Sequence, residues 1–235
     1  IDRLDEPDRW EPRLALDGYV LQALMNKYGW AHPQVEQRIE QSRGLVERDI
    51  SVDLRVQHIW LMLTYHHVAS HRAEVMRLSL QLEELARRQG DAGILVAACT
   101  WIGLAFYSEG RFEEAERYLS EAIDERHADA SKHHAAQLGF DTVSWALAAR
   151  SLVRWGAGHD ALANEDGVRA VERARALAHI PSMGITMLYQ ALGYLGRQDV
   201  ERARQVVDEL IELSGRYGLP AFRGYAEVIR CWVVG

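Results

Sequence analysis

Small and aromatic side chains recur at fixed intervals between residues 96 and 127, and their spacing predicts a hairpin of two helices. Gly103 and Ala115 are small, so that two antiparallel helices can approach each other closely. Gly110 lies between them and supplies the backbone freedom that a sharp turn needs. The space around the contact is expected to be filled by three larger side chains, Phe106, Phe112 and Leu119. A single hairpin cannot bury its apolar face alone, so the pattern predicts stacked neighbours and an all-α solenoid.

This spacing resembles the tetratricopeptide repeat, a pair of antiparallel helices about 34 residues long. The resemblance implies a right-handed superhelical solenoid, here of about ten to eleven helices, that presents a surface to a partner. The turn positions of successive hairpins are 39, 48 and 40 residues apart, at His71, Gly110, Gly158 and Gln198. The longest interval includes an irregular stretch, residues 128–140. Arrays of the HEAT or armadillo type have similar periods but lack this small-residue pattern.

Apolar periodicity and glycine or proline punctuation predict one repeat domain over residues 1–235. Ser51 is expected to cap the helix that begins at residue 52. The chain opens at Ile1 without Met and stops at Gly235 inside a helical pattern, so we expect a piece of a larger protein. Helix pairs are expected over residues 8–48, 52–89, 92–126, 141–179 and 182–216, followed by an unpaired helix over 220–234.

Composition narrows the class of protein. A net charge of -7 argues against a broad nucleic-acid-binding face. Cys99 and Cys231 lie in helical patterns among apolar neighbours, as reduced thiols of a cytoplasmic protein do. No apolar run approaches the ~20 residues that span a bilayer, and no signal peptide is present. We therefore expect a cytoplasmic protein that contacts neither membranes nor nucleic acid directly.

Longer sequence runs extend the resemblance over nearly the whole chain; they are residues 23–36, 59–61, 65–67, 103–112, 155–159 and 217–222. These runs are similar to the C-terminal helical region of bacterial signalling proteins that link a STAND-type ATPase to a class III adenylate/guanylate cyclase or a protein kinase. The resemblance implies a regulatory module that binds a protein or peptide, including other domains of the same polypeptide, while the catalytic domains lie outside this chain. Related regions accompany transcription activators like the maltose activator. They imply an alternative, a domain that senses a small-molecule effector.

The chain lacks the motifs that carry chemistry. It has no nucleophile elbow, no phosphate-binding loop and no Rossmann glycine fingerprint, so we expect no enzyme activity and no cofactor. His67, His71 and Glu74 would converge on one metal if a single helix ran through them. The turn expected at His71 separates Glu74 from the pair, so no metal site is expected.

Two groups of polar residues each allow two interpretations. His133 and His134 could titrate near neutral pH and act as a switch, or they could simply be solvated, as a loop pair of histidines usually is. A charged helix face either forms ion pairs along the helix or holds an anionic ligand. Its residues are Arg169, Glu172, Arg173 and Arg175.

The expected partner-binding residues lie on the first helix of each hairpin, which lines the concave surface of tetratricopeptide arrays. Tyr and Trp there offer a large contact area with few rotors to immobilise. The alternative is that residues 128–140 cover this face, or that the helices curl it shut; Trp145 and Trp155 are then core residues. Counted from the signature glycines, the predicted set is His58, Leu61, Tyr65, Ala97, Thr100, Leu104, Tyr107, Trp145, Leu152 and Trp155.

Overall fold

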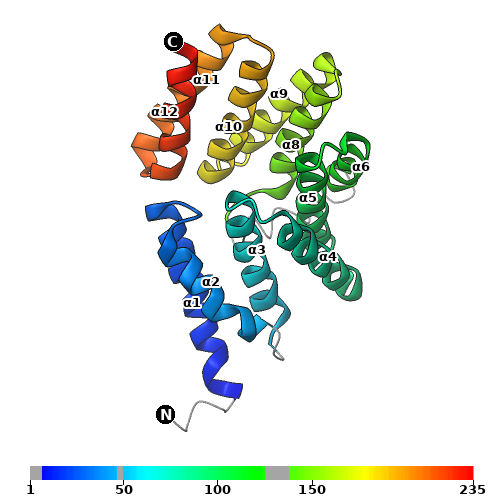
Figure 1. The fold of residues 1–235 in the computed structure, drawn as a ribbon, viewed down its shortest axis with the longest axis vertical. Helices are drawn as coiled ribbons and strands as arrows, with labels where there is room; N and C mark the ends of the chain where they lie inside the picture. The colour runs from blue at the N-terminus through cyan, green and yellow to red at the C-terminus, as the bar shows by residue number, and fades with distance from the viewer. Residues whose placement is uncertain (1–6, 47–49, 125–137, 235) are drawn as a thin grey trace. The chain divides into compact units, whose positions relative to one another are not determined.

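The computed structural model describes residues 7–46, 50–124 and 138–234. In these ranges it contains eleven helices and no strand, which confirms the all-α class (Figure 1). None of the helices described is both long and apolar enough to cross a membrane. The chain divides into two compact units, residues 1–78 and 79–235, and the division falls within helix α4. Each unit is described by itself.

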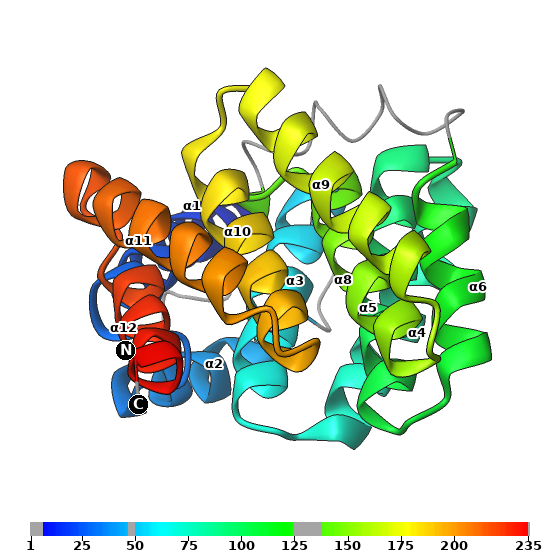
Figure 2. The same ribbon diagram turned by 90° about the horizontal axis from the view of Figure 1, so that it is seen from above.

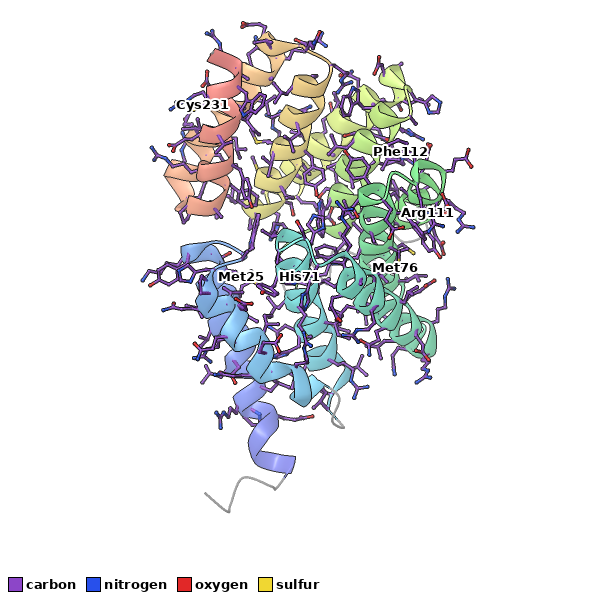
Figure 3. All side chains as sticks on the ribbon, viewed as in Figure 1. Met25, His71, Met76, Arg111, Phe112 and Cys231 are labelled. Carbon is purple, nitrogen blue, oxygen red and sulfur yellow. The ribbon has the colours of Figure 1, made fainter. Side chains whose placement is uncertain are left out.

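Unit 1 is built on three helices, α1 (Pro7–Tyr28), α2 (Pro33–Val46) and α3 (Val52–Val68), with the first turns of α4 (Arg72–Gln89). Each of the first three helices packs against the other two. The apolar stripes predicted from periodicity form the core between them. Met25 is one of its fully buried side chains (Figure 3). Others are Leu14, Leu21, Val35, Ile39 and Leu63.

Unit 2 continues from the rest of α4, and its described residues contain seven further helices. They are α5 (Ala92–Ser108), α6 (Phe112–Ala122), α8 (Thr142–Gly156), α9 (Asp160–Ala176), α10 (Ile180–Gly196), α11 (Val200–Tyr217) and α12 (Pro220–Val234).

From α5 to α12, the described helices of unit 2 pack in chain order, each against the next (Figure 2). In addition α5 contacts α8, α8 contacts α10, and α10 contacts α12. We call α5, α8, α10 and α12 the first-helix layer, and α6, α9 and α11, which pack mainly on it, the second-helix layer. Two layers of this kind are how helical hairpins stack in a solenoid.

The turns inside the hairpins repeat one backbone geometry. The left-handed residue is Ser70, Gly110, Gly158 or Gln198, with φ of 62, 74, 83 and 60°. Each turn is closed by two hydrogen bonds of the Schellman type; in one of them, the N–H of Arg111 donates to the carbonyl of Phe106 at 3.0 Å. Successive left-handed turn residues are therefore 40, 48 and 40 residues apart. The first turn position is Ser70 and not His71, because helix α3 ends before it at Val68.

Capping carboxylates begin three of the helices. Asp91, Asp141 and Asp199 each accept a hydrogen bond from the backbone N–H three residues ahead. Such caps satisfy N–H groups that the helix itself leaves without partners. Ser51 stands at the N-cap of α3 as expected, but its side chain makes no capping bond. Its backbone N–H instead donates to Glu11 Oε1 at 2.8 Å.

The hairpin of α5 and α6 depends on a close approach at Gly103. A β-carbon at this position would lie 2.5 Å from Leu119 Cγ. The side chain nearest to Gly103 is therefore Leu119 rather than Ala115, although Ala115 is also fully buried. Small size at position 103 is a packing requirement, and the contact fixes the register of the two helices.

Candidate functional site

Most of the predicted partner-binding side chains are buried. Tyr107 and Trp155 keep part of their surface exposed. A partner can reach these two side chains in this conformation, whereas the others contribute to packing. The buried members are His58, Leu61, Tyr65, Ala97, Thr100, Leu104, Trp145 and Leu152.

In unit 1 the buried members join α3 to its surroundings. Tyr65 is only 4% exposed, and its hydroxyl donates a hydrogen bond to the Glu36 carboxylate of α2. Burial, and then this carboxylate, raise the pKa of Tyr65. His58 Nδ1 lies 3.0 Å from the Leu54 carbonyl oxygen, and burial lowers the pKa of its imidazole. Both side chains therefore stabilise unit 1.

In unit 2 two of the predicted tryptophans connect neighbouring hairpins. Trp145 of α8 meets Trp101 of α5 edge to face, with ring centroids 4.7 Å apart. The ring of Trp155 lies against the backbone of α10, since a β-carbon on Gly196 would be 2.6 Å from its Cζ2 atom. Edge-to-face aromatic pairs stabilise beyond the area they bury. Trp155 is thus partly a packing residue, and only part of its surface is exposed.

Three tyrosines of the first-helix layer, Tyr107, Tyr189 and Tyr225, are called the tyrosine row, because Tyr189 interacts electrostatically with each of the other two. They come from α5, α10 and α12. Burial raises the pKa of Tyr189 to about 12, a hydrogen bond from Trp145 opposes this shift, and the other two phenols add to it. Burial also raises the pKa of Tyr107 and of Tyr225. All three phenols are therefore protonated donors at neutral pH, and each keeps part of its surface exposed.

Sequence reasoning missed Tyr189 and Tyr225. The offsets that give Ala97, Thr100, Leu104 and Tyr107 from Gly110 do not reach Tyr189 when they are counted from Gln198; they give Ile185, Leu188, Leu192 and Leu195. Helix α12 was predicted without a partner helix, so no positions were counted on it. The available signal for Tyr189 was the largely apolar stretch around it, whereas Tyr225 lies between Arg223 and Glu227 and has no such signal.

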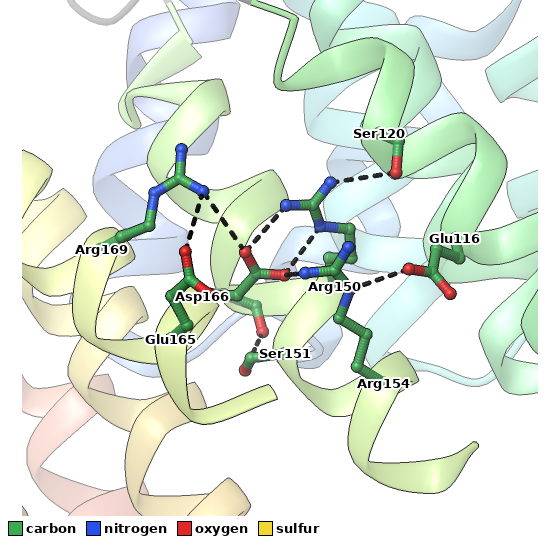
Figure 4. A network of polar contacts seen from close by, with 9 residues as sticks. Glu116, Ser120, Arg150, Ser151, Arg154, Glu165, Asp166 and Arg169 are labelled. Carbon is green, nitrogen blue, oxygen red and sulfur yellow. Dashed lines mark hydrogen bonds and ion pairs between the residues drawn. The ribbon is translucent and has the colours of Figure 1, made fainter. Parts of the chain in front are cut away.

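A buried ion-pair network joins α6, α8 and α9 (Figure 4). Arg150 Nε and Nη2 donate to the two carboxylate oxygens of Asp166 at 2.7 and 2.8 Å. Arg150 Nη1 also donates to Ser120 Oγ at 3.0 Å. Arg154 donates to Asp166 at 2.9 Å and to Glu116 at 2.8 Å. The two guanidinium charges are matched by two carboxylate charges, so the network holds two hairpins together without a net buried charge.

A second buried network surrounds the N-terminus of α8. Arg173 donates twice to the Asp141 carboxylate, at 2.7 and 3.0 Å. Burial would raise the pKa of Asp141, but Arg173 and the Ser144 N–H hold it below its ordinary value. Ser182 Oγ accepts from the Asp141 N–H at 2.7 Å and lies 2.7 Å from His179 Nδ1. The carboxylate binds Arg173 rather than the imidazole, and Ser182 is fully buried, so these groups do not form a nucleophilic triad.

The arginines of the predicted charged face on α9 form ion pairs with different partners. Arg173 pairs with Asp141, and Arg175 pairs with Glu209 of α11 at 2.6 Å. Arg169 lies 3.9 Å from both Glu165 and Asp166. A hollow of about 400 Å³ opens beside this face. Its lining residues are Ile123, Val143, Leu147, Arg169, Glu172, Arg173 and Ala176.

The histidines near the first hairpin turn do not gather around a metal position. His71 lies in the turn after α3, and its Nδ1 is 3.1 Å from Nδ1 of His66 rather than near His67. Glu74 pairs with Arg77 at 2.8 Å. Among the residues described, no group of three or more His, Cys, Asp or Glu could hold a metal ion. His133 and His134 lie outside the described residues.

Comparison with known proteins identifies no relative of this chain. No family model matches it, and no curated protein and no solved structure does either. The candidate site consequently rests on geometry and chemistry, namely a row of partly exposed phenols along one layer of stacked helices.

Proposed function

We propose that this chain is a non-catalytic interaction and regulatory module, which binds a protein or peptide on the first-helix layer of unit 2. The tyrosine row is the observation that carries the proposal. Three phenols with exposed surface recur on α5, α10 and α12, three helices of the first-helix layer. Such a surface is fixed by packing before a partner arrives, which lowers the entropy cost of binding.

The chemistry of the row suits a polypeptide ligand. A tyrosine offers an apolar ring and a hydroxyl donor at the cost of few rotors. Aromatic side chains anchored in a packed surface are typical binding hot spots. Protonated phenols donate to backbone carbonyls, which every peptide supplies. The row therefore favours a peptide segment, with selectivity set by the side chains around it.

The regulatory part of the proposal rests on the sequence resemblance. Tetratricopeptide-type arrays linked to cyclase, ATPase or kinase domains in bacterial signalling proteins bind partners and control the attached domains. We extend this role to the present chain, in the cytoplasm, with the partner on another protein or on another part of the same polypeptide. The module itself performs no reaction in this account.

A peptide selection tests the proposal. A random peptide library displayed on phage is selected on the immobilised chain and, in parallel, on the variant Tyr107→Ala/Tyr189→Ala/Tyr225→Ala. Tyr217→Ala is the control, because Tyr217 lies at the end of α11, is 50% exposed and is outside the row. We expect sequences that enrich on the parent and on the control but not on the triple variant, whose helix content is checked by circular dichroism. Equal enrichment on all three proteins would contradict a role for the row.

The hollow beside α9 favours a second candidate function, that of a small-molecule sensor. Its size is within the range of ligand pockets, about 300–1,000 Å³, and it combines apolar walls with two arginines and a glutamate. A ligand that binds one conformation better than another would shift their populations. The test is a thermal shift with a panel of small carboxylates and phosphates, repeated on Arg169→Ala. A shift that the variant loses supports the sensor, and no shift with any compound argues against it.

A further inference from the structure

Two histidines face each other across the turn between α3 and α4 in unit 1, and we call His66 and His71 the histidine pair. Nδ1 of His66, in the last turn of α3, lies 3.1 Å from Nδ1 of His71, which stands just before α4 (Figure 3). The backbone makes the same link, because the His71 N–H donates to the His66 carbonyl at 2.8 Å. The ring of Tyr65 packs edge-on against both imidazoles, with centroids 5.0 and 5.9 Å away.

Burial decides which imidazole of the pair donates. His66 is only 2% exposed, and among the residues described its Nε2 atom has no hydrogen-bond partner. Buried N–H groups without a partner are rare in proteins, so the proton of neutral His66 belongs on Nδ1. Nδ1 of His66 then donates to Nδ1 of His71, and the exposed His71 ring keeps its own proton on Nε2.

An added proton on either ring disfavours this arrangement. On His71 it turns the acceptor Nδ1 into a donor, which then faces the N–H of His66. On His66 it places a cation in a buried site, with a second N–H that has no partner. The closed contact is therefore stable only while both imidazoles are neutral.

The carboxylates near the pair are already bound to arginines. Glu74 of α4 accepts from Arg77 at 2.8 and 3.0 Å. Glu40 of α2 pairs with Arg43 at 3.0 Å. Burial lowers the pKa of His66, Arg43 and the other imidazole act in the same direction, and the two glutamates oppose the shift. Because each carboxylate is shared with an arginine, it stabilises an imidazolium only weakly.

The backbone of this turn is unfavourable by itself. Ser70 adopts a left-handed conformation, with φ of 62°, which costs free energy in any residue that has a β-carbon. At the equivalent turns after α5 and α8 this residue is Gly110 or Gly158. The α3–α4 turn therefore depends on contacts across it, such as the histidine pair.

We propose that the histidine pair is a pH-sensitive switch of the α3–α4 turn, which is closed at neutral pH and opens in mild acid. In the open turn both imidazoles reach water and accept protons, whereas burial in the closed turn opposes protonation. Falling pH therefore shifts the population from the closed to the open turn, and rising pH restores it. The switch acts within unit 1, on the start of α4, and is independent of the tyrosine row.

Hydrogen exchange of backbone amides, followed by NMR on the whole chain, tests the proposal. The reporter is the His71 N–H, which is hydrogen-bonded in the closed turn. Protection factors are compared at pH 7.5 and pH 5.5, on either side of about 6.5, where an imidazole in water titrates. One proton that only the open turn accepts raises the open population about tenfold over this range. We expect the protection of this amide to fall about tenfold in the parent.

Two variants separate the pair from other histidines. His71→Asn keeps an acceptor for His66 but has no basic nitrogen, so its turn should be equally protected at both pH values. His58 and His67, whose pKa values burial also lowers, are present in the variant and the parent alike. His159→Asn is the matched control, because the His159 N–H closes the equivalent turn after α8 at 2.8 Å, and an arginine rather than a histidine stands five residues before it. This control should lose protection at residue 71 as the parent does.

Equal protection of the His71 amide at both pH values in the parent would overturn the proposal, and so would an equal acid loss in His71→Asn. The ¹⁵N chemical shifts of the imidazoles in the parent at pH 7.5 give a second test that needs no variant. We expect a proton on Nδ1 of His66 and on Nε2 of His71. Protons on Nε2 of both rings would mean that no hydrogen bond joins them, and this result would also overturn the proposal.

Discussion

Leu119 on α6 packs directly against Gly103 on α5, where a β-carbon would lie only 2.5 Å from Leu119 Cγ. Leu119 is fully buried, so it cannot swing away from a larger neighbour. This contact makes Gly103 a determinant of how the hairpin closes. Tyr107 lies one turn further along the same side of α5, and its ring is 6.1 Å from that of Phe112 on α6.

The first prediction concerns this contact. Gly103→Leu adds a side chain where the core has no room, and we expect it to lower the free energy of unfolding by about 1–3 kcal/mol. Gly224 is the matched control, because it is also in a helix of unit 2 and a β-carbon there meets nothing within 4 Å. Gly224→Leu should leave stability unchanged or raise it slightly, since leucine favours helix more than glycine. Urea unfolding measures both, and a Gly103→Leu variant as stable as the parent would refute the register.

The second prediction concerns the buried ion pairs. Asp166→Asn leaves Arg150 and Arg154 without their shared carboxylate in a buried site, which typically costs about 3–5 kcal/mol. Glu84→Gln removes the carboxylate of an exposed pair with Arg88 on α4, and should cost no more than about 1 kcal/mol. Thermal unfolding of the two variants gives the comparison. Similar losses in both would mean that the network of Figure 4 does not join the hairpins.

The third prediction concerns the left-handed turn residues. Gly110→Ala places a β-carbon in open space but in a left-handed conformation, so we expect a loss of about 1–2 kcal/mol from the backbone alone. Gln198 already occupies this conformation, and Gln198→Gly should therefore stabilise the chain or leave it unchanged. Melting temperatures check both changes. A Gly110→Ala variant as stable as the parent, or a Gln198→Gly variant less stable than the parent, would contradict the shared turn geometry.

The fourth prediction concerns alkaline pH. Burial raises the pKa of Cys99 from 9.0 to about 12 and that of Tyr189 from 10.0 to about 12. A raised pKa in the folded chain means that the unfolded chain loses its proton first, so stability is full below pH 9 and falls as the pH rises toward 12. Cys99→Ala should flatten this fall, by at most about 4 kcal/mol at pH 12. Denaturant unfolding between pH 8 and 11 measures it, and an unchanged pH dependence in the variant would argue against this origin.

The helices could be predicted closely from the sequence because their ends are marked locally. Pro33 and Pro220 begin helices, as expected. Gly90 and Gly218 directly follow the ends of α4 and α11, and both have a left-handed backbone conformation. The turn at Ser70 was placed one residue late, at His71, because no glycine marks it. The structure divides the chain into two compact units. A single repeat domain over residues 1–235 stays a prediction.

The partners of buried charges could not be predicted, because they depend on packing between hairpins. Arg150 and Asp166 are 16 residues apart on different helices, and Arg173 and Asp141 are 32 apart. Periodicity shows which side of a helix is apolar but not how many neighbours cover it. For this reason side chains such as Leu104 and Trp145, expected to face a partner, are buried by adjacent helices.

The central claim is that a polypeptide partner binds the tyrosine row of unit 2. Its most direct test is isothermal titration of the chain with a peptide obtained from the phage selection, compared with Tyr107→Ala/Tyr189→Ala/Tyr225→Ala and with the control Tyr217→Ala. The account predicts a dissociation constant at least tenfold weaker for the triple variant, which corresponds to about 1.4 kcal/mol, and an unchanged constant for the control. Equal affinity of the folded triple variant and the parent would contradict it.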